Sequence, residues 1–411
     1  MNNMKKPKIR FKGFTDDWEQ RKVGELTNVL SASRVHKEEW AEDGIPFFRS
    51  SDVVSAFKGT ENEKAFISIE LYEKLAKSSG KLEQNDILIT GGGSIGIPYI
   101  VPDNKPLYSK DADLIWIKHS ANFDSRYLYT YFISEEFREY LASISHTGTI
   151  AHYTIEQVKD TPVRLPLIDE QRALGDFFVS LDHLITLHQR KYEKLQIIKK
   201  SMLENCFPKN GEKVPKIRFS GFTGDWEQRK LSEMVGMTYG GGTPSTANDT
   251  FWYGDIPWIQ SSNVVEDELF NVDIKKHISR DGLNHSAAQL VSENSVAVVT
   301  HVGVGKLVFM PYSYTTSQDF ISLGDMKCEP RFLCYALYKR LQEDLHIVQG
   351  SAIKGITKED LMNKVISVPQ ITEQTKIANT LQGLDHLITL HQSELEKLQK
   401  IKKSLLERMF V

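Results

Sequence analysis

The feature that most constrains the fold of this chain is an internal duplication. Residues 7–22 read PKIRFKGFTDDWEQRK, and the stretch recurs at 215–230 as PKIRFSGFTGDWEQRK. The nonapeptide LDHLITLHQ stands at 181–189 and again, without any change, at 384–392. A repeat of this size indicates two copies of one folding unit, and we expect each copy to be one domain followed by one helix. A molecule with such a pseudo-two-fold axis suits a target that is itself in two parts.

The composition is that of an ordinary globular protein. The 411 residues suit two or three domains, and 40% of them are hydrophobic and 26% charged. The formal net charge of −3 argues against a positively charged surface over the whole protein, which many nucleic-acid-binding proteins have. Basic residues cluster only locally, as in residues 5–10.

The cysteines and the apolar segments bear on the cellular compartment. Cys206, Cys328 and Cys334 are too few and too widely spaced for a disulfide framework or a zinc site, so we expect reduced thiols and no metal. The N-terminus lacks the apolar stretch of a signal peptide. The most apolar region, 296–309, contains a histidine and a lysine and is too short to span a bilayer. These features predict a cytoplasmic protein.

The first half of the chain has the pattern of a strand-rich domain. Its apolar segments are short, rich in β-branched and aromatic residues, and separated by Gly and Pro. Helical periodicity is found around 69–76 and 125–144. The second half follows the same plan with more drift, so the sequence predicts an α+β fold with two strand-rich domains in tandem. The strands expected in the first half are 45–48, 87–90, 99–101 and 114–117.

A Pro-x-x-x-Glu-Gln motif at 166–171 and again at 369–374 predicts the start of a long helix after each domain. Asp169 and Thr372 are the candidate N-caps of these helices. The segments that we predict are a first domain at 1–165, a first spacer helix at 166–208, a second domain at 209–368 and a second spacer helix at 369–411.

Apolar residues in both helices recur in steps of three and four, the spacing of a coiled-coil seam. A helix of about 28 residues is about 42 Å long, and burying one leucine is worth about 1.5–3 kcal/mol, so each helix needs a partner. We expect the helices to pair through Leu181, Leu184, Leu195, Ile198, Met202, Leu384, Leu387, Leu398, Ile401 and Leu405.

The connections set the direction of this pairing. The first helix reaches the second domain through the short link 208–214, and the second domain must end where the second helix begins. With parallel helices, that domain would have to bridge roughly 40 Å between opposite helix ends. We therefore expect an antiparallel coiled coil with the domains at its opposite ends and with Val411 near the first PKIRF motif.

The duplicated motifs together resemble the specificity subunit of type I restriction-modification systems. The PKIRF-x-GFT-x-DWEQRK opening occurs twice, and so does the Pro-x-x-x-Glu-Gln motif followed by Leu-Asp. The resemblance covers the whole chain and implies two target-recognition domains, each of which reads one half of a bipartite DNA site. It also implies that the repeated helices bind two methyltransferase subunits, and that restriction subunits join to complete the nuclease.

Simple geometry agrees with this resemblance. Two domains about 40 Å apart match roughly one turn of DNA, which is about 34–36 Å. Because the domains differ in sequence, the two half-sites should also differ, and the helix length would set the number of unread base pairs between them. We expect an asymmetric site.

We expect no catalytic residues in this chain. The resemblance places an Asn/Asp-Pro-Pro-Tyr/Phe loop in the methyltransferase partner, and this chain has no Pro-Pro dipeptide. No constellation of His, Ser and acidic residues is defined by spacing alone. No cofactor is therefore expected here, and S-adenosylmethionine, ATP and Mg²⁺ are expected on the partner subunits. Two alternatives remain, namely a coiled-coil protein-binding adaptor without DNA specificity and a stand-alone nucleic-acid enzyme.

Candidate DNA contacts are loops in which both halves keep small or polar residues but differ in the side chain that could read a base. Phosphate contacts position a protein on DNA, whereas contacts to base edges specify the sequence. In the first pair of loops, Arg suits guanine, and Gln or Asn suits adenine; the structural alternative is that these residues cap a strand end. The residues of this pair are Arg49, Ser50, Ser51 and Asp52 in the first half and Gln260, Ser261, Ser262 and Asn263 in the second.

The second pair aligns the Gly-rich residues 90–96 with 300–306. Glycine lets the backbone approach a phosphate closely, although a tight turn between strands explains it equally well. The candidate contacts are Gly92, Gly93 and Ser94 in the first half and His301, Gly303 and Lys306 in the second.

Two further pairs complete the set. The third aligns 109–111 with 317–319 and exchanges Lys110 for Gln318, which is also what surface drift would produce. The fourth is a small, polar stretch shortly before each spacer helix, with His146, Thr147, Thr149 and His152 in the first half and Gln349, Ser351 and Lys354 in the second.

Other duplicated residues are expected to have structural roles. Trp18 and Trp226, in the repeated opening, are interpreted as packing anchors. The histidines repeated on the helices suggest packing or contact with a partner protein, and they are His183, His188, His386 and His391.

Overall fold

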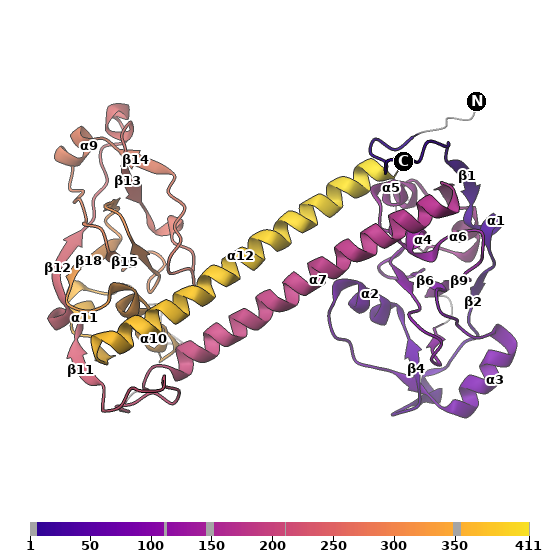
Figure 1. Cartoon of the computed structure of the whole chain (residues 1–411), viewed down its shortest axis with the longest axis horizontal. Helices are drawn as coiled ribbons and strands as arrows, with labels where there is room; N and C mark the ends of the chain where they lie inside the picture. Colours follow the sequence, from indigo (N-terminus) through magenta and orange to yellow (C-terminus); the bar gives the residue numbers. More distant parts are fainter. Residues whose placement is uncertain (1–5, 111–112, 145–151, 210, 348–354, 411) are drawn as a thin grey trace. The chain divides into compact units, whose positions relative to one another are not determined.

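The computed structural model describes residues 6–110, 113–144, 152–209, 211–347 and 355–410 (Figure 1). The chain divides into two compact units. Unit 1 combines residues 1–190 with 392–411, and unit 2 contains residues 191–391. Each unit thus contains one globular domain and parts of both long helices.

Unit 1 is built around a four-stranded antiparallel sheet in the order β2-β9-β6-β7. Every residue of β6 and β9 is buried, because helices cover both faces of the sheet. Alternate side chains of a strand point to opposite faces. Ile87 and Ile89 therefore pack with the helices α4 and α5, whereas Leu88 packs with Val53 of α2. The bounds are Val29–Ser31 (β2), Leu114–Ile117 (β9), Ile87–Thr90 (β6), Pro98–Ile100 (β7), Ser50–Lys58 (α2), Ser125–Phe132 (α4) and Glu135–Ile144 (α5).

Two smaller sheets complete unit 1. One has the order β3-β5-β4-β8, with β4 and β8 parallel, and the other pairs β1 with β10. The strands are Glu19–Lys22 (β1), Trp40–Ala41 (β3), Ile45–Phe48 (β4), Phe66–Ile67 (β5), Tyr108–Ser109 (β8) and Pro162–Leu165 (β10). The remaining short helices are Val23–Leu26 (α1), Lys37–Glu39 (η1), Ile69–Ser79 (α3) and Ile155–Asp160 (α6).

Unit 2 repeats this topology. Its main sheet has the order β12-β18-β15-β16, a second sheet has the order β14-β13-β17 with β13 and β17 parallel, and β11 pairs with β19. The strands are Glu227–Lys230 (β11), Val235–Gly240 (β12), Ile256–Ile259 (β13), Lys276–Ile278 (β14), Ser295–Val299 (β15), Leu307–Met310 (β16), Thr315–Thr316 (β17), Phe320–Met326 (β18) and Val365–Val368 (β19).

The units differ in the helices between these strands. The helices of unit 2 are Leu231–Met234 (α8), Asp249–Trp252 (η2), Ser261–Asn263 (η3), Arg280–Asn284 (α9), Pro330–Ile347 (α10) and Lys358–Met362 (α11). The single helix α10 takes the place of α4 and α5, and the three-residue η3 takes the place of the nine-residue α2. The shared framework with changed connections confirms the α+β tandem repeat.

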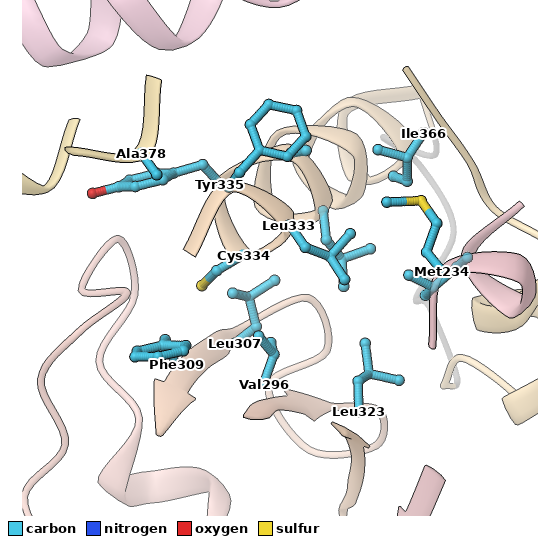
Figure 2. Packing of buried hydrophobic residues seen from close by; sticks show 14 of the residues in the cluster. Met234, Val296, Leu307, Phe309, Leu323, Leu333, Cys334, Tyr335, Ile366 and Ala378 are labelled. Atoms are coloured by element: carbon cyan, nitrogen blue, oxygen red, sulfur yellow. The ribbon is translucent and has the colours of Figure 1, made fainter. Parts of the chain in front are cut away.

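The core of unit 2 lies between α10 and the main sheet (Figure 2). Leu333 of α10 is fully buried and belongs to one cluster with Val296 and Leu323 of the sheet. Ala378, near the start of the second long helix, belongs to the same cluster. The core therefore fixes the start of that helix to the domain.

The two long helices are α7 (Ile168–Asn205) and α12 (Ile371–Met409). They contain 38 and 39 residues, lie within the predicted spacer segments 166–208 and 369–411, and are longer than the 28 residues used above to estimate the helix length. They begin one residue before Asp169 and Thr372, so these two residues lie in the first turn and are not the N-caps.

Ion pairs show the direction in which the helices run. In unit 1, Lys402 of α12 lies 2.6 Å from Asp182 of α7, and in unit 2, Lys199 of α7 lies 2.5 Å from Asp385 of α12. The early part of one helix thus meets the late part of the other in both units. This confirms the antiparallel pairing.

The buried seam differs in part from the prediction. Leu181 and Leu195 are buried, and Met202, Leu384, Leu398 and Leu405 are half-buried. From Leu181, alternating steps of four and three lead along the heptad through Ile185, Tyr192 and Leu195 to Met202, so the other predicted positions fall on the outer face. The residues that we correct are Leu184, Ile198, Leu387 and Ile401, which are 46%, 37%, 39% and 40% exposed.

The repeated opening is a structural joint. Arg10 donates two hydrogen bonds, of 2.6 and 2.7 Å, to the carboxylate of Glu170, and Arg218 does the same to Glu373 at 2.8 Å each. Both carboxylates are buried. Both repeated tryptophans are also buried, Trp18 at 4% exposure and Trp226 at 2%, as expected for packing anchors.

The start of each copy is also joined to the end of a long helix. The amide of Ile9 donates to the carbonyl of Arg408 at 3.0 Å, near the end of α12, and Ile217 donates to Asn205 at 2.9 Å, at the end of α7. Val411 lies outside the described residues. The contact at Arg408 nevertheless agrees with the expectation that the chain ends near the first PKIRF motif.

Among the helices of the described part of the chain, none has the length and apolar character that a membrane span requires.

Candidate nucleic-acid interface

The predicted segments of unit 1 meet at one place. The start of α2, the loop between β6 and β7, the end of β8 and the segment that contains His152 are joined by backbone hydrogen bonds. The hydroxyl of Ser50 also donates to the carbonyl of Asp113 at 2.9 Å. The backbone bonds, each of 2.8 Å, run from Lys110 to Phe48, from Gly91 to Asp113 and from Tyr153 to Gly91.

Unit 2 brings the matching segments together in the same way. Lys306 adds a side-chain contact, because its ammonium group donates to the carbonyl of Val264 at 3.3 Å. The backbone bonds, again of 2.8 Å each, run from Ser317 to Ile259, from Thr300 to Asp319 and from Ile356 to Thr300. Loops that are far apart in the sequence thus form one surface in each unit.

The strand register corrects two of the alignments by one residue. Thr90 donates its amide to Ile97 as Val299 does to Lys306, so Thr90 corresponds to Val299 and not to Thr300. Similarly, β8 pairs Ser109 with Phe48, whereas β17 pairs Thr316 with Ile259. Lys110 therefore matches Ser317 and not Gln318. The loop sequences differ between the two halves, whereas the hydrogen bonds between the strands are the same. For this reason an alignment based on residue identity alone was wrong by one residue.

The first pair of loops caps the elements that follow. The backbone amide of Arg49 donates to the carboxylate of Asp52 at 2.8 Å, and that of Gln260 donates to the side chain of Asn263 at 2.9 Å. Asp52 and Asn263 therefore have a capping role, although they cap the starts of α2 and η3 and not a strand end as the structural alternative held. A base contact by their neighbours stays a prediction.

Arg49 is held by its own loop. Its guanidinium group donates to Asp52 at 2.9 Å and lies 5.6 Å from the ring centre of Trp40. Burial by itself raises the pKa of the Asp52 carboxyl, but hydrogen bonds from Arg49 and Asn62 outweigh burial, so this pKa lies below its ordinary value. A bidentate contact to guanine would require this pairing to open. In unit 2, the side-chain amide of Gln260 donates to the neighbouring hydroxyl of Ser262 at 3.0 Å.

The Gly-rich segment of unit 1 is a hairpin loop. Residues 91–96 spell Gly-x-Gly-x-x-Gly, but they join two antiparallel strands and not a strand to a helix, so the dinucleotide-binding geometry is absent. Gly93 and Gly303 have φ values of +70° and +84° and are exposed at the loop tips. The tight-turn alternative is therefore confirmed, and a phosphate contact by the exposed backbone stays a prediction.

Sequence reasoning missed the glycine near the end of each hairpin loop, which is Gly96 in unit 1 and Gly305 in unit 2. A Cβ atom added to Gly96 would lie 2.4 Å from Leu141, and one added to Gly305 would lie 2.6 Å from Leu345. Both positions also have positive φ. They press the hairpin against α5 and α10, and their recurrence in both halves was the signal that could have revealed them.

The remaining candidates differ in exposure. His152, His301, Ser51, Ser94 and Ser262 are exposed. Lys110 forms an ion pair with Asp113. The carbonyl of Asp113 also accepts hydrogen bonds from Ser50 and Gly91, so Asp113 connects the segments of the unit 1 site, and sequence reasoning missed it. Gln318 is exposed and accepts a hydrogen bond from Thr243 at 2.8 Å. Six candidates lie outside the described residues, namely His146, Thr147, Thr149, Gln349, Ser351 and Lys354.

Among the described residues, no group of three or more His, Cys, Asp or Glu side chains is placed so that it could hold a metal ion. The cysteines are free thiols, and burial raises the pKa of Cys328 to about 12.

A family model described as the type I restriction modification DNA specificity domain matches residues 15–196 and 223–400. The chain belongs to this family. Both matches begin in the repeated opening and run into the long helices, so the family unit is the repeat itself. The chain is accordingly a DNA-recognition subunit of a type I restriction-modification system.

Relatives and solved structures agree with the family. The chain is 22% identical, over 98% of its length and 95% of the relative, to the putative type I restriction enzyme MjaX specificity subunit of Methanocaldococcus jannaschii. It is 27% identical to the EcoR124I/EcoR124II specificity subunit of Escherichia coli, over 40% of this chain and 42% of that one. The crystal structure of the type I S subunit from M. genitalium shares the fold, with a TM-score of 0.64 and 13% identity over 99% of each chain.

Proposed function

We propose that each unit of this specificity subunit reads one half of an asymmetric, bipartite DNA site. The observation that carries this proposal is that both units bring the same four segments together on matching hydrogen bonds, while the exposed side chains differ. In the corrected register, the exposed His301 of unit 2 stands where unit 1 has Gly92, and the exposed Ser94 of unit 1 stands where unit 2 has Gly303. A common frame with different readers suits two unlike half-sites on one duplex.

The two helices are proposed to bind two methyltransferase subunits. Leu184 and Leu187 of α7 are each 46% exposed, and their repeats Leu387 and Leu390 of α12 are 39% and 46% exposed. Leucines left on the surface at the same positions of an identical nonapeptide provide two copies of one apolar face. Two copies of one face can hold two copies of one partner.

Catalysis is proposed to belong to the other chains. In this proposal S-adenosylmethionine is bound by the methyltransferase subunits, restriction subunits complete the nuclease, and ATP and Mg²⁺ are used there. The specificity subunit contributes the choice of sequence.

An exchange of one domain tests the half-site proposal. Residues 209–368 are replaced by the corresponding residues of a related specificity subunit, and the methylated sites are determined by sequencing genomic DNA from cells that carry the complete system. We expect one half of the methylated motif to change and the other half to stay. A reciprocal exchange of residues 1–165 should change the other half, and a change of both halves in either exchange would rule out independent reading.

A binding measurement separates DNA recognition from a pure adaptor role. The full chain should bind duplex DNA with an affinity that falls as salt rises, because released counterions drive phosphate contacts. The adaptor alternative predicts no such affinity and no site preference in the assembled complex.

A further inference from the structure

Unit 2 has an aromatic and basic hollow outside the four segments described above. The hollow has a volume of ≈ 650 Å³ and is lined by residues in and around η2 and around the start of β14. Tyr253, in its wall, is 80% exposed. Lys275, Lys276 and His277 line the other side. An exposed aromatic side chain beside three basic residues offers groups that can contact the sugar and phosphate of a nucleic-acid backbone.

The frame of the hollow is well fixed. Trp252 packs edge to face on Trp258 with ring centres 5.1 Å apart, and its indole N–H donates to the carbonyl of Ser245 at 3.1 Å. The ammonium group of Lys276 lies 5.2 Å from the ring of Trp252 and 5.8 Å from that of Trp258. Lys275, in contrast, forms an exposed ion pair with Asp273, with 3.1 Å between the ammonium nitrogen and a carboxylate oxygen.

Unit 1 has a similar frame and keeps one of these side chains, because Lys64 precedes β5 at the position that Lys275 occupies before β14. Trp40 packs edge to face on Phe47, as Trp252 does on Trp258, and Ala41 follows Trp40 in the chain as Tyr253 follows Trp252. The strand register places Phe66 opposite Pro46 as His277 lies opposite Pro257. Unit 1 instead carries exposed acidic residues around Trp40, namely Glu38, Glu39, Glu42 and Asp43.

The hollow adjoins the candidate interface of unit 2. Lys276 pairs with Trp258, two residues before Gln260, which is a distance of about 7 Å along a strand. The side chain of Asn263 also donates to the carbonyl of Asp273 at 2.8 Å, which ties the predicted reading loop to the segment that leads into Lys275. A duplex bound at the loop would therefore extend over the hollow.

We propose that the hollow formed by Tyr253, Lys275, Lys276 and His277 binds the phosphodiester backbone of duplex DNA beside the half-site of unit 2. The proposal rests on the DNA-reading role proposed above. The lysines offer ammonium donors to phosphate oxygens, and the tyrosine offers a hydroxyl donor and a ring that can pack on deoxyribose. The contact positions unit 2 on the duplex and reads no base. The four exposed carboxylates around Trp40 would weaken a phosphate contact in unit 1, so we assign this contact to unit 2.

The test compares single substitutions in the full chain. Lys275→Ala and Tyr253→Ala are measured against Lys64→Ala, because Lys64 precedes β5 at the position that Lys275 occupies before β14. Binding to a labelled duplex that contains the methylated site is followed by fluorescence anisotropy at several salt concentrations. Each lost phosphate contact lowers the slope of log affinity against log salt by roughly 0.9.

We expect Lys275→Ala to lower this slope by about one and to weaken binding to unrelated duplexes as much as to the cognate one. Tyr253→Ala should weaken both alike, and Lys64→Ala should leave affinity and slope unchanged. Lys275 is exposed, so its loss should leave the thermal unfolding temperature in place.

The possible failures are distinguishable. If the unaltered chain binds no DNA, the proposed function itself is wrong. If the unaltered chain binds and both hollow variants match it in affinity and slope, the hollow is not a phosphate site although DNA recognition stands. If a hollow variant changes the methylated motif, the hollow reads bases, and the positioning role is rejected.

Discussion

Lys199 of α7 and Asp385 of α12 form an ion pair of 2.5 Å in unit 2, and the repeat reproduces it in unit 1 as Lys402 and Asp182 at 2.6 Å. The two copies differ in their surroundings. Asp385 is 19% exposed and also accepts a hydrogen bond from the hydroxyl of Tyr335 at 2.5 Å, whereas Asp182 is 36% exposed. The duplication thus provides one interaction at two depths of burial.

Asp385→Ala should therefore destabilise more than Asp182→Ala. The first substitution leaves a largely buried ammonium group and a phenol without their acceptor, at a cost of roughly 3 kcal/mol. The second removes a more exposed pair and should cost about 1 kcal/mol or less. Thermal unfolding of both variants checks the order, and equal shifts would contradict the role given to burial.

The joint between Arg218 and Glu373 should be essential to unit 2. Glu373 is fully buried, so Arg218→Ala would leave an unpaired buried carboxylate and cost roughly 3–5 kcal/mol. Arg10→Ala should do the same in unit 1 through Glu170. Hydrogen exchange should show lost protection confined to the unit that carries the substitution. The double variant Arg218→Met with Glu373→Met removes both charges and should recover much of the loss, and no recovery would argue against the ion pair as the cause.

The sequence predicted the scaffold better than the surface. The duplicated letters around Arg10 and Glu170 encode buried contacts, which tolerate little change, and the short β-branched runs encode strands such as Ile87–Thr90 that are buried on both faces. The seam was only partly predicted, because Leu184 and Leu195 have the same hydrophobicity and only the heptad phase separates them. The loops resisted prediction, since the match of Lys110 to Ser317 depends on hydrogen bonds that run between distant segments.

The joint at the chain ends predicts that the order of the halves can be exchanged. Ile9 donates to Arg408 as Ile217 donates to Asn205, although only the second pair is closely linked along the chain. A circular permutant that opens between Lys209 and Gly211 and joins the original ends by a short flexible linker should therefore fold and keep its DNA specificity. Circular dichroism and the methylated motif in cells check this. A permutant opened inside β15 serves as a control and should not fold.

Buried tyrosines predict a loss of stability at alkaline pH. Burial raises the pKa of Tyr314 to about 12, from an ordinary value near 10. The folded state thus keeps the phenol protonated while the unfolded state loses the proton near pH 10. The contribution is present in full below pH 10 and falls as pH rises toward 12, by up to about 3 kcal/mol.

Unfolding experiments between neutral pH and pH 12 can measure this effect. Tyr314→Phe should show a shallower decline in stability above pH 10 than the unaltered chain. Tyr253, which is exposed, provides the matched control, and Tyr253→Phe should leave the decline unchanged. Identical pH profiles for the two variants would contradict the assignment.

The outer leucines predict a separation between folding and partner binding. Leu195 is buried in the seam at 9% exposure, so Leu195→Ala should lower stability by about 2–5 kcal/mol. Leu184 is 46% exposed on the outer face, so Leu184→Ala should change stability little. If this face binds a methyltransferase subunit, Leu184→Ala combined with Leu187→Ala should weaken one of two partner sites, and the same change at Leu387 and Leu390 should weaken the other. Sedimentation of the assembled complex should then show one bound subunit for either pair and none for all four changes. Two bound subunits in the fourfold variant would show that the docking face lies elsewhere.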